Sequence, residues 1–187
     1  MAKLVNGNWQ DLGQSQNFNV KRLENTTFPT TDLAAQEKFR VEVMSLHNAI
    51  NNGDDLLISS INEMESIKRD IKNKISNPKL IEKAEAIRQG LMDLEIQLNG
   101  NELITKNMEL ISPSISSRVS KIRYSFNSST SPSTSTQKQG FAIASKEFSQ
   151  WIVRFNNLNK EINELGSALI NSGIIIQSGK QDINWQN

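Results

Sequence analysis

Apolar residues recur at intervals of three and four positions along three long segments of this chain. The recurring residues are Phe39, Val43, Leu46, Ile50, Leu57, Met64, Ile67 and Ile71 in the first segment, Leu80, Ala84, Ile87, Leu91, Leu94 and Leu98 in the second, and Phe141, Ala144, Phe148, Trp151, Phe155, Leu158, Ile162, Leu165 and Leu169 in the third. Such spacing places each set on one face of an α-helix, and three such faces can bury one another. Nothing polar recurs within the stripes. We therefore expect a helical bundle whose core is built for shape and not for chemistry.

The first helix is expected to run from about Asp32 to Ile75. A hydroxyl from Thr30 or Thr31 is available as its N-terminal cap, and Asp32 places an acid in its first turn. Asn51 to Asp54, which includes Gly53, has the composition of a helix stop, yet the heptad phase continues through it from Ile50 to Leu57. A loop would normally reset that phase, so one long helix with a weak point at Gly53 is favoured over two helices.

Three more helices follow, separated by breakers. Pro78 opens the second, which runs from Lys79 to about Leu98, and the third begins at Ser112-Pro113. The tract from 127 to 136 holds Ser, Thr and Pro with no apolar residue, and is expected to be an exposed loop. The last helix runs from about Gln137 to Ser172. The tail beyond it is too apolar to be a free end, and is expected to fold back over the tip of the bundle.

Helix lengths indicate how these segments are arranged. At 1.5 Å per residue the first helix spans roughly 65 Å and the last roughly 55 Å, while the second and third together fill the same length in the opposite direction. The predicted fold is mainly α: an elongated antiparallel bundle of three rows and about four helices. It occupies residues 29–187, and a short β-hairpin with a linker precedes it in residues 1–28.

The hairpin prediction rests on an Asn-Gly turn. Lys3 to Val5 and Trp9 to Leu12 flank Asn6-Gly7-Asn8, and a further extended run, Gln16 to Val20, places Phe18 and Val20 on one face. A lone hairpin is only marginally stable in water. It therefore either packs on the helices or is the remnant of a preceding β-domain, and the second alternative is favoured.

Composition excludes several classes of partner. The 21 Lys and Arg residues nearly cancel the 20 Asp and Glu residues, and the basic residues are scattered, which argues against nucleic acid. No stretch is long and apolar enough to enter a membrane, and no targeting segment stands in this chain. Cysteine is absent, so disulfides and thiolate metal sites are excluded. We expect a monomer.

Residues that could carry chemistry are few. His47 is the only histidine and lies one position beyond Leu46, off the core stripe, so an ordinary helix residue is the favoured interpretation. Acids that could form a glycosidase-type pair stand among basic residues at helical spacings, which is typical of a solvated face with ion pairs. These acids are Glu63, Glu65, Asp70, Glu82, Glu85, Asp93 and Glu95. No Gly-rich phosphate loop occurs. We therefore expect no catalytic, cofactor-binding or metal-binding residue, and no enzyme.

The closing third of the chain carries a recognisable order of segments. Ile115 to Val119 precedes the Ser128 to Thr134 loop, Ala142 to Phe148 follows it, and a short tail after Gly173 ends near Trp185. This order resembles the C-terminal region of large secreted bacterial β-propeller proteins related to sortilin and VPS10 domains, which are often labelled glycosyl hydrolases or sialidase-like. The segment from 16 to 23 is similar to the last strand of the small β-domain that precedes the helices in that family.

The resemblance implies a non-catalytic helical accessory or interaction module of a secreted or cell-surface propeller protein, with the propeller as its protein partner. A self-standing coiled-coil-type adaptor that binds another protein is the alternative. Two departures stand out: Ser178-Gly179-Lys180 replaces a Pro-Gly-Arg-like stretch, and the propeller that would hold an active site is absent. No catalytic residue is therefore carried over from the family.

Overall fold

The computed structural model describes residues 2–11, 13, 17–21, 32–74, 77–101, 112–128, 131–172 and 183. Within these ranges the elements are, in chain order, β1 (Ala2–Val5), β2 (Asn8–Asp11), α1 (Leu33–Lys74), α2 (Pro78–Asn99), α4 (Ile115–Ser128) and α5 (Ser135–Asn171). Each helix predicted from the apolar spacing is present, and its bounds agree with the prediction to within about three residues. The mainly α fold with a preceding hairpin is therefore confirmed.

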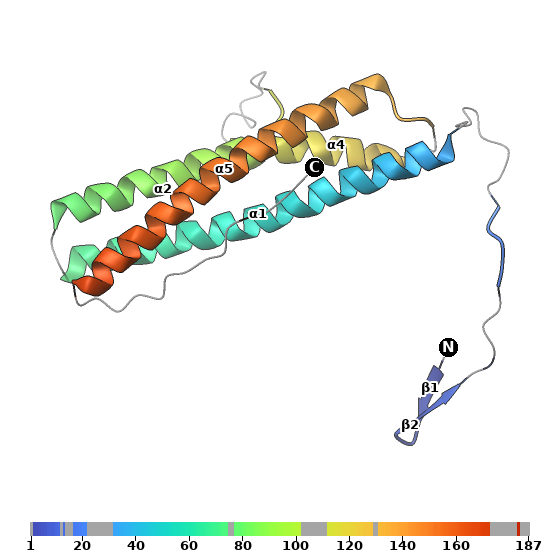
Figure 1. Ribbon diagram of the computed structural model, residues 1–187, viewed down its shortest axis with the longest axis horizontal. Coiled ribbons are helices and arrows are strands. Elements are labelled where there is room, and N and C mark those ends of the chain that lie inside the picture. Colours follow the sequence, from blue (N-terminus) through green and yellow to red (C-terminus); the bar gives the residue numbers. More distant parts are fainter. Residues whose placement is uncertain are drawn as a thin grey trace.

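The helices form an elongated bundle of three rows. The long helices α1 and α5 run in the same direction, and α2 followed by α4 runs the opposite way along them (Figure 1). Both α2 and α4 contact α1 and α5, and they contact each other where one ends and the next begins. The two shorter helices thus share one row, as their lengths predict.

The predicted stripes form the core of this bundle. All of their residues are buried except Leu80, Phe141 and Leu158, which are partly buried against it. Trp151 is the largest side chain that is fully buried, and its ring stacks between Phe148 and Phe155, with ring centroids 5.6 and 5.3 Å away. The indole Nε1–H donates to the backbone carbonyl of Leu94 in α2 at 3.0 Å. One residue of α5 thereby anchors the row formed by α2.

Gly53 lies inside α1 and does not interrupt it. A Cβ atom at this position would lie 3.2 Å from the Trp151 ring and 3.5 Å from that of Phe148. The missing side chain lets the indole approach the backbone of α1 closely. Gly53 is therefore a packing position, which explains why the heptad phase continues through a segment with the composition of a helix stop.

Side-chain caps fix the helix ends. Asp32 Oδ1 accepts the backbone N–H of Ala35 at 2.9 Å, and Asn77 Oδ1 accepts that of Lys79 at 3.1 Å. Thr134 and Gln137 form a reciprocal capping box, in which Thr134 Oγ1 accepts from Gln137 N at 3.2 Å and Gln137 Oε1 accepts from Thr134 N at 2.8 Å.

The end of α4 and the start of α5 differ from the boundaries predicted for the loop between them. The loop predicted for 127–136 is shorter than expected, because α4 continues to Ser128 and the capping box starts α5 at Ser135. Of the residues between the two helices, 131–134 are described, and Ser129 and Thr130 lie outside the described ranges.

The N-terminal strands form the predicted hairpin. Ala2 pairs with Asp11, Lys3 with Gln10, Leu4 with Trp9 and Val5 with Asn8. Asn6 and Gly7 have positive φ angles of 50° and 82°, as a two-residue hairpin turn requires. Among the described residues the hairpin contacts no helix, and it lies apart from the bundle in Figure 1. The described part of the hairpin therefore does not pack on the helices.

The extended run predicted for Gln16 to Val20 is not part of a sheet. Residues 17–21 belong to no strand, and Gln16 lies outside the described ranges. A strand needs a partner for its hydrogen bonds, and the two-stranded sheet of β1 and β2 does not extend to these residues.

One residue of the tail, Ile183, lies against the bundle, but not at the tip that the prediction named. Ile183 packs against the core and hydrogen-bonds to Asn156 in α5. Asn156 lies roughly 22 Å before the C-terminal end of α5. Ile183 therefore lies along the side of the bundle and not at its tip. Ile174, Ile176 and Trp185, on which the prediction rested, lie outside the described residues.

Candidate functional site

Two of the acids considered above, Glu65 in α1 and Glu85 in α2, take part in an ion-pair network between these two helices. Glu85 lies at its centre, where it accepts hydrogen bonds from Lys68 across the helix interface and from Arg88 Nη2 at 2.8 Å within α2. Arg88 Nη1 also lies 3.5 Å from Glu65 Oε1 in α1. These side chains are at least partly exposed, so the network agrees with the solvated face predicted for them.

The network changes the acidity of its central carboxyl group. Hydrogen bonds from Arg88 and then from Lys68 lower the pKa of Glu85 from 4.5 to about 2. A general acid of a glycosidase needs a raised pKa, so the shift at Glu85 has the wrong direction for that role. Its carboxylate is held as a permanent charge between cations.

Glu85 predicts a small dependence of stability on pH. Its folded-state pKa lies below the unfolded value, so its contribution is present above about pH 4.5 and is lost as the pH falls towards about 2. We expect the melting temperature of Glu85→Gln to fall less than that of the wild type over this window, as measured by circular dichroism. Glu82→Gln, at an exposed position of the same helix, is the control. An unchanged pH dependence in Glu85→Gln would contradict the assignment, and added salt should weaken the effect.

The other predicted residues do not converge on a site. Asp93 accepts a hydrogen bond from Gln89 one turn away at 3.0 Å, and His47 is half-buried beside the fully buried Leu46. Within the described ranges, no group of three or more His, Asp or Glu side chains is placed to hold a metal ion. No described helix is long and apolar enough to cross a membrane.

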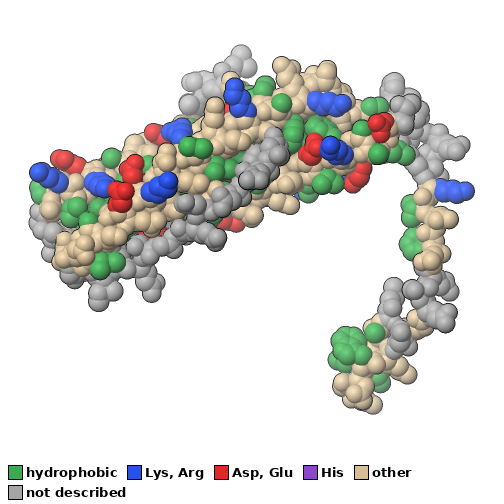
Figure 2. All heavy atoms as spheres, in the orientation of Figure 1, with side chains coloured by type: hydrophobic (Ala, Val, Ile, Leu, Met, Phe, Trp, Pro, Cys, Tyr) green, Lys and Arg blue, Asp and Glu red, His purple; other side chains and the backbone are tan. Residues whose placement is uncertain are grey.

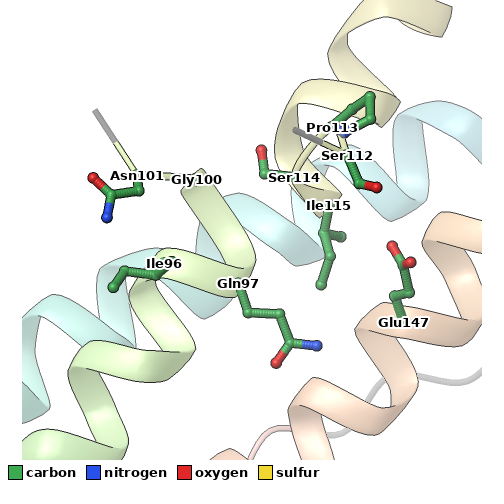
Figure 3. Close-up of a pocket in the computed structure, with 9 residues that line it drawn as sticks. All are labelled: Ile96, Gln97, Gly100, Asn101, Ser112, Pro113, Ser114, Ile115 and Glu147. Carbon is green, nitrogen blue, oxygen red and sulfur yellow. The ribbon is translucent and has the colours of Figure 1, made fainter. Parts of the chain in front are cut away.

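A pocket of about 300 Å³ lies where α2 ends and α4 begins (Figure 3). Ile96 and Gln97 line it from α2, Ser114 and Ile115 from the start of α4, and Glu147 from α5. Sequence spacing could not identify this group, because the residues come from three helices and meet only through the packing of the rows.

Two polar side chains of the pocket, Gln97 and Glu147, contact arginines of the bundle. Glu147 Oε2 lies 3.8 Å from Arg118 Nε, and Gln97 Oε1 accepts a hydrogen bond from Arg154 Nη1 at 3.0 Å. Among the described residues that line this pocket, Glu147 is the only acid, so these residues form no pair of carboxylates for acid and base catalysis. Its described lining is a mixed apolar and polar surface without a catalytic arrangement.

No protein-family model matches the chain, and no curated protein or solved structure matches it either. The resemblance to the helical region of sortilin-related propeller proteins therefore enters the functional argument as a hypothesis.

Proposed function

We propose that this chain is a non-catalytic helical module that binds another protein. In its finer form, the proposal makes the chain an accessory or interaction domain of a secreted β-propeller protein of the sortilin-related kind. The helical bundle serves as a rigid body, and the N-terminal arm, defined as residues 2–11 and 17–21, makes the contact.

The exposure of the arm carries the proposal. Trp9 is 74% exposed, Phe18 84% and Val20 85%, although each is a residue type that proteins usually bury. Leu4 pairs with Trp9 across the hairpin, so both side chains lie on the same face of the two-stranded sheet. Hydrophobic side chains are visible on the hairpin in Figure 2. Exposed apolar groups of this kind favour burial against a partner.

A β-domain suits the arm better than a helical partner. Among the described residues the sheet has two strands, so each strand has one edge whose backbone N–H and C=O groups lack a described strand partner. Strands of another domain can satisfy these groups by extending the sheet, while the Leu4 and Trp9 face is buried. The assignment of that domain to a propeller protein rests on the resemblance alone.

The alternative, a coiled-coil adaptor, would need a continuous exposed stripe along a helix. On α1 the exposed large apolar residues are Leu33, Val41, Met44 and Ile58. Exposed polar residues such as Glu37, Asn48 and Asn51 interrupt them at helical spacing. The continuous stripes are already buried inside the bundle, so this alternative has less support.

Deleting residues 1–22 tests whether the arm is independent of the bundle. We expect the melting temperature of the helices to change little, because the described arm residues contact no helix. Amide hydrogen exchange provides the matching measurement on the intact chain: Phe18 and Val20 amides should exchange far faster than that of Phe148. Equal protection at these positions would contradict an arm that is free to bind.

Binding itself is tested with the product of any propeller reading frame that adjoins the gene. Isothermal titration calorimetry should detect a complex with the intact chain, and both deletion of residues 1–22 and Trp9→Ala should weaken it at least tenfold. Val153→Ala, at an exposed position on α5, is the control and should leave the affinity unchanged. A complex that forms equally well without the arm would overturn the proposal.

A further inference from the structure

A side-chain amide on α5 holds the backbone of a residue near the C-terminus. Asn156 Nδ2 donates to the carbonyl oxygen of Ile183 at 3.0 Å, and Asn156 Oδ1 accepts from the backbone N–H of Ile183 at 3.0 Å. One carboxamide thus satisfies both backbone groups of one residue, as a neighbouring strand does in an antiparallel ladder. The Ile183 side chain, meanwhile, packs against the hydrophobic core of the bundle.

These contacts define a surface that we call the Asn156 site: the Asn156 carboxamide together with the part of the core that Ile183 contacts. The paired hydrogen bonds recognise backbone groups, which every non-proline residue in an extended peptide offers. The apolar contact adds a preference for an aliphatic side chain. Sheet edges and grooves bind extended peptides through the same two features. Backbone hydrogen bonds provide affinity, and pockets for side chains provide selectivity.

We propose that the Asn156 site is a docking site for an extended peptide that carries an aliphatic residue, and that the chain's own Ile183 fills it in the free protein. The site lies on the bundle and involves no residue of the N-terminal arm. The inference rests on the proposed function only in treating the chain as a binding module.

Because Ile183 already occupies the Asn156 site, a peptide in solution must compete with it. A short tether gives the chain's own segment an effective concentration of about 1 mM at the site. If the intrinsic dissociation constant is about 0.1 mM, a peptide in solution binds the wild type roughly tenfold more weakly than it binds a protein whose site is empty. A variant in which Ile183 no longer occupies the site should therefore bind an added peptide with the intrinsic affinity of the site.

The test uses the full chain with Ile183→Asp, which places a charge where the aliphatic side chain packs. The probe is a fluorescently labelled synthetic peptide of residues 179–187, followed by fluorescence anisotropy. We expect saturable binding to Ile183→Asp that is about tenfold tighter than binding to the wild type. Circular dichroism checks that the variant remains helical.

Two controls address the mechanism. A peptide whose Ile183 nitrogen is methylated lacks the N–H that Asn156 Oδ1 accepts, and it should bind Ile183→Asp at least tenfold more weakly. This control leaves the protein unaltered, so it holds even if a further variant fails to fold. Asn156→Ala in the Ile183→Asp background should cause a similar loss.

Three results would overturn the inference: no saturable binding to Ile183→Asp at up to about 1 mM peptide, equal binding of the methylated peptide, or equal affinity of wild type and Ile183→Asp. The same titration on a variant without residues 1–22 separates this inference from the proposed function. Peptide binding should persist there even if the arm binds no partner.

Discussion

Replacing Trp151 with alanine should lower the free energy of unfolding by about 3–5 kcal/mol, the largest loss that we expect from a single truncation in this chain. Trp151 is fully buried, and its ring lies between Phe148 and Phe155 at centroid distances near those of stacked aromatic pairs. Its removal leaves a cavity where α1, α2 and α5 meet, and it also removes the hydrogen bond to Leu94. Urea denaturation followed by circular dichroism measures the loss.

Two further variants divide that loss into its causes. Trp151→Phe keeps an aromatic ring but removes the N–H donor and part of the volume, so we expect a smaller loss of about 1–2 kcal/mol. Trp9→Ala removes the same side chain from a position that is 74% exposed, and it should change stability very little. If Trp151→Ala cost no more than Trp9→Ala, the central packing of the bundle would be wrong.

The bundle could be predicted well from the sequence, because the apolar residues that form its core recur at helical spacing along each helix. A stripe of nine apolar residues along α5 tolerates several ambiguous positions, and its buried face follows from helical spacing alone. The start of α5 was also readable: Thr134 stands three residues before Gln137, which is the spacing of a capping box. The prediction placed this helix start two residues too late by following the apolar pattern and not the cap.

Other features depend on which residues meet across helices. In the sequence Asn156 is an ordinary polar residue between Phe155 and Asn157, and its role is visible only where Ile183 lies beside it. The pocket around Glu147 exists only where two helices that share a row come end to end, against α5. Sequence spacing describes one helix at a time and cannot place such pairs. The helices were therefore predictable, whereas the contact between Asn156 and Ile183 and the pocket were not.

The contact between Gly53 and Trp151 is of the same kind, and it yields the second prediction. Gly53→Leu should destabilise the bundle by about 2–3 kcal/mol, because the new side chain must enter space that the indole already fills. The indole cannot easily move aside, since it stacks with both Phe148 and Phe155 and donates a hydrogen bond to the backbone carbonyl of Leu94. The higher helix propensity of leucine offsets this loss by less than about 1 kcal/mol.

Smaller substitutions separate propensity from packing. Gly53→Ala gains about 1 kcal/mol of helix propensity but places its Cβ 3.2 Å from the Trp151 ring, so we expect the two effects nearly to cancel. At Gly140 in α5 a Cβ would meet its nearest neighbour, Ile122, at an ordinary 3.5 Å, and Gly140→Ala should therefore stabilise the bundle by about 0.5–1 kcal/mol. Urea denaturation of the three variants measures the differences. If Gly53→Leu were as stable as Gly140→Ala, the close contact between Gly53 and Trp151 would be contradicted. Gly53 would then be only a position of low helix propensity in α1, as the sequence predicts.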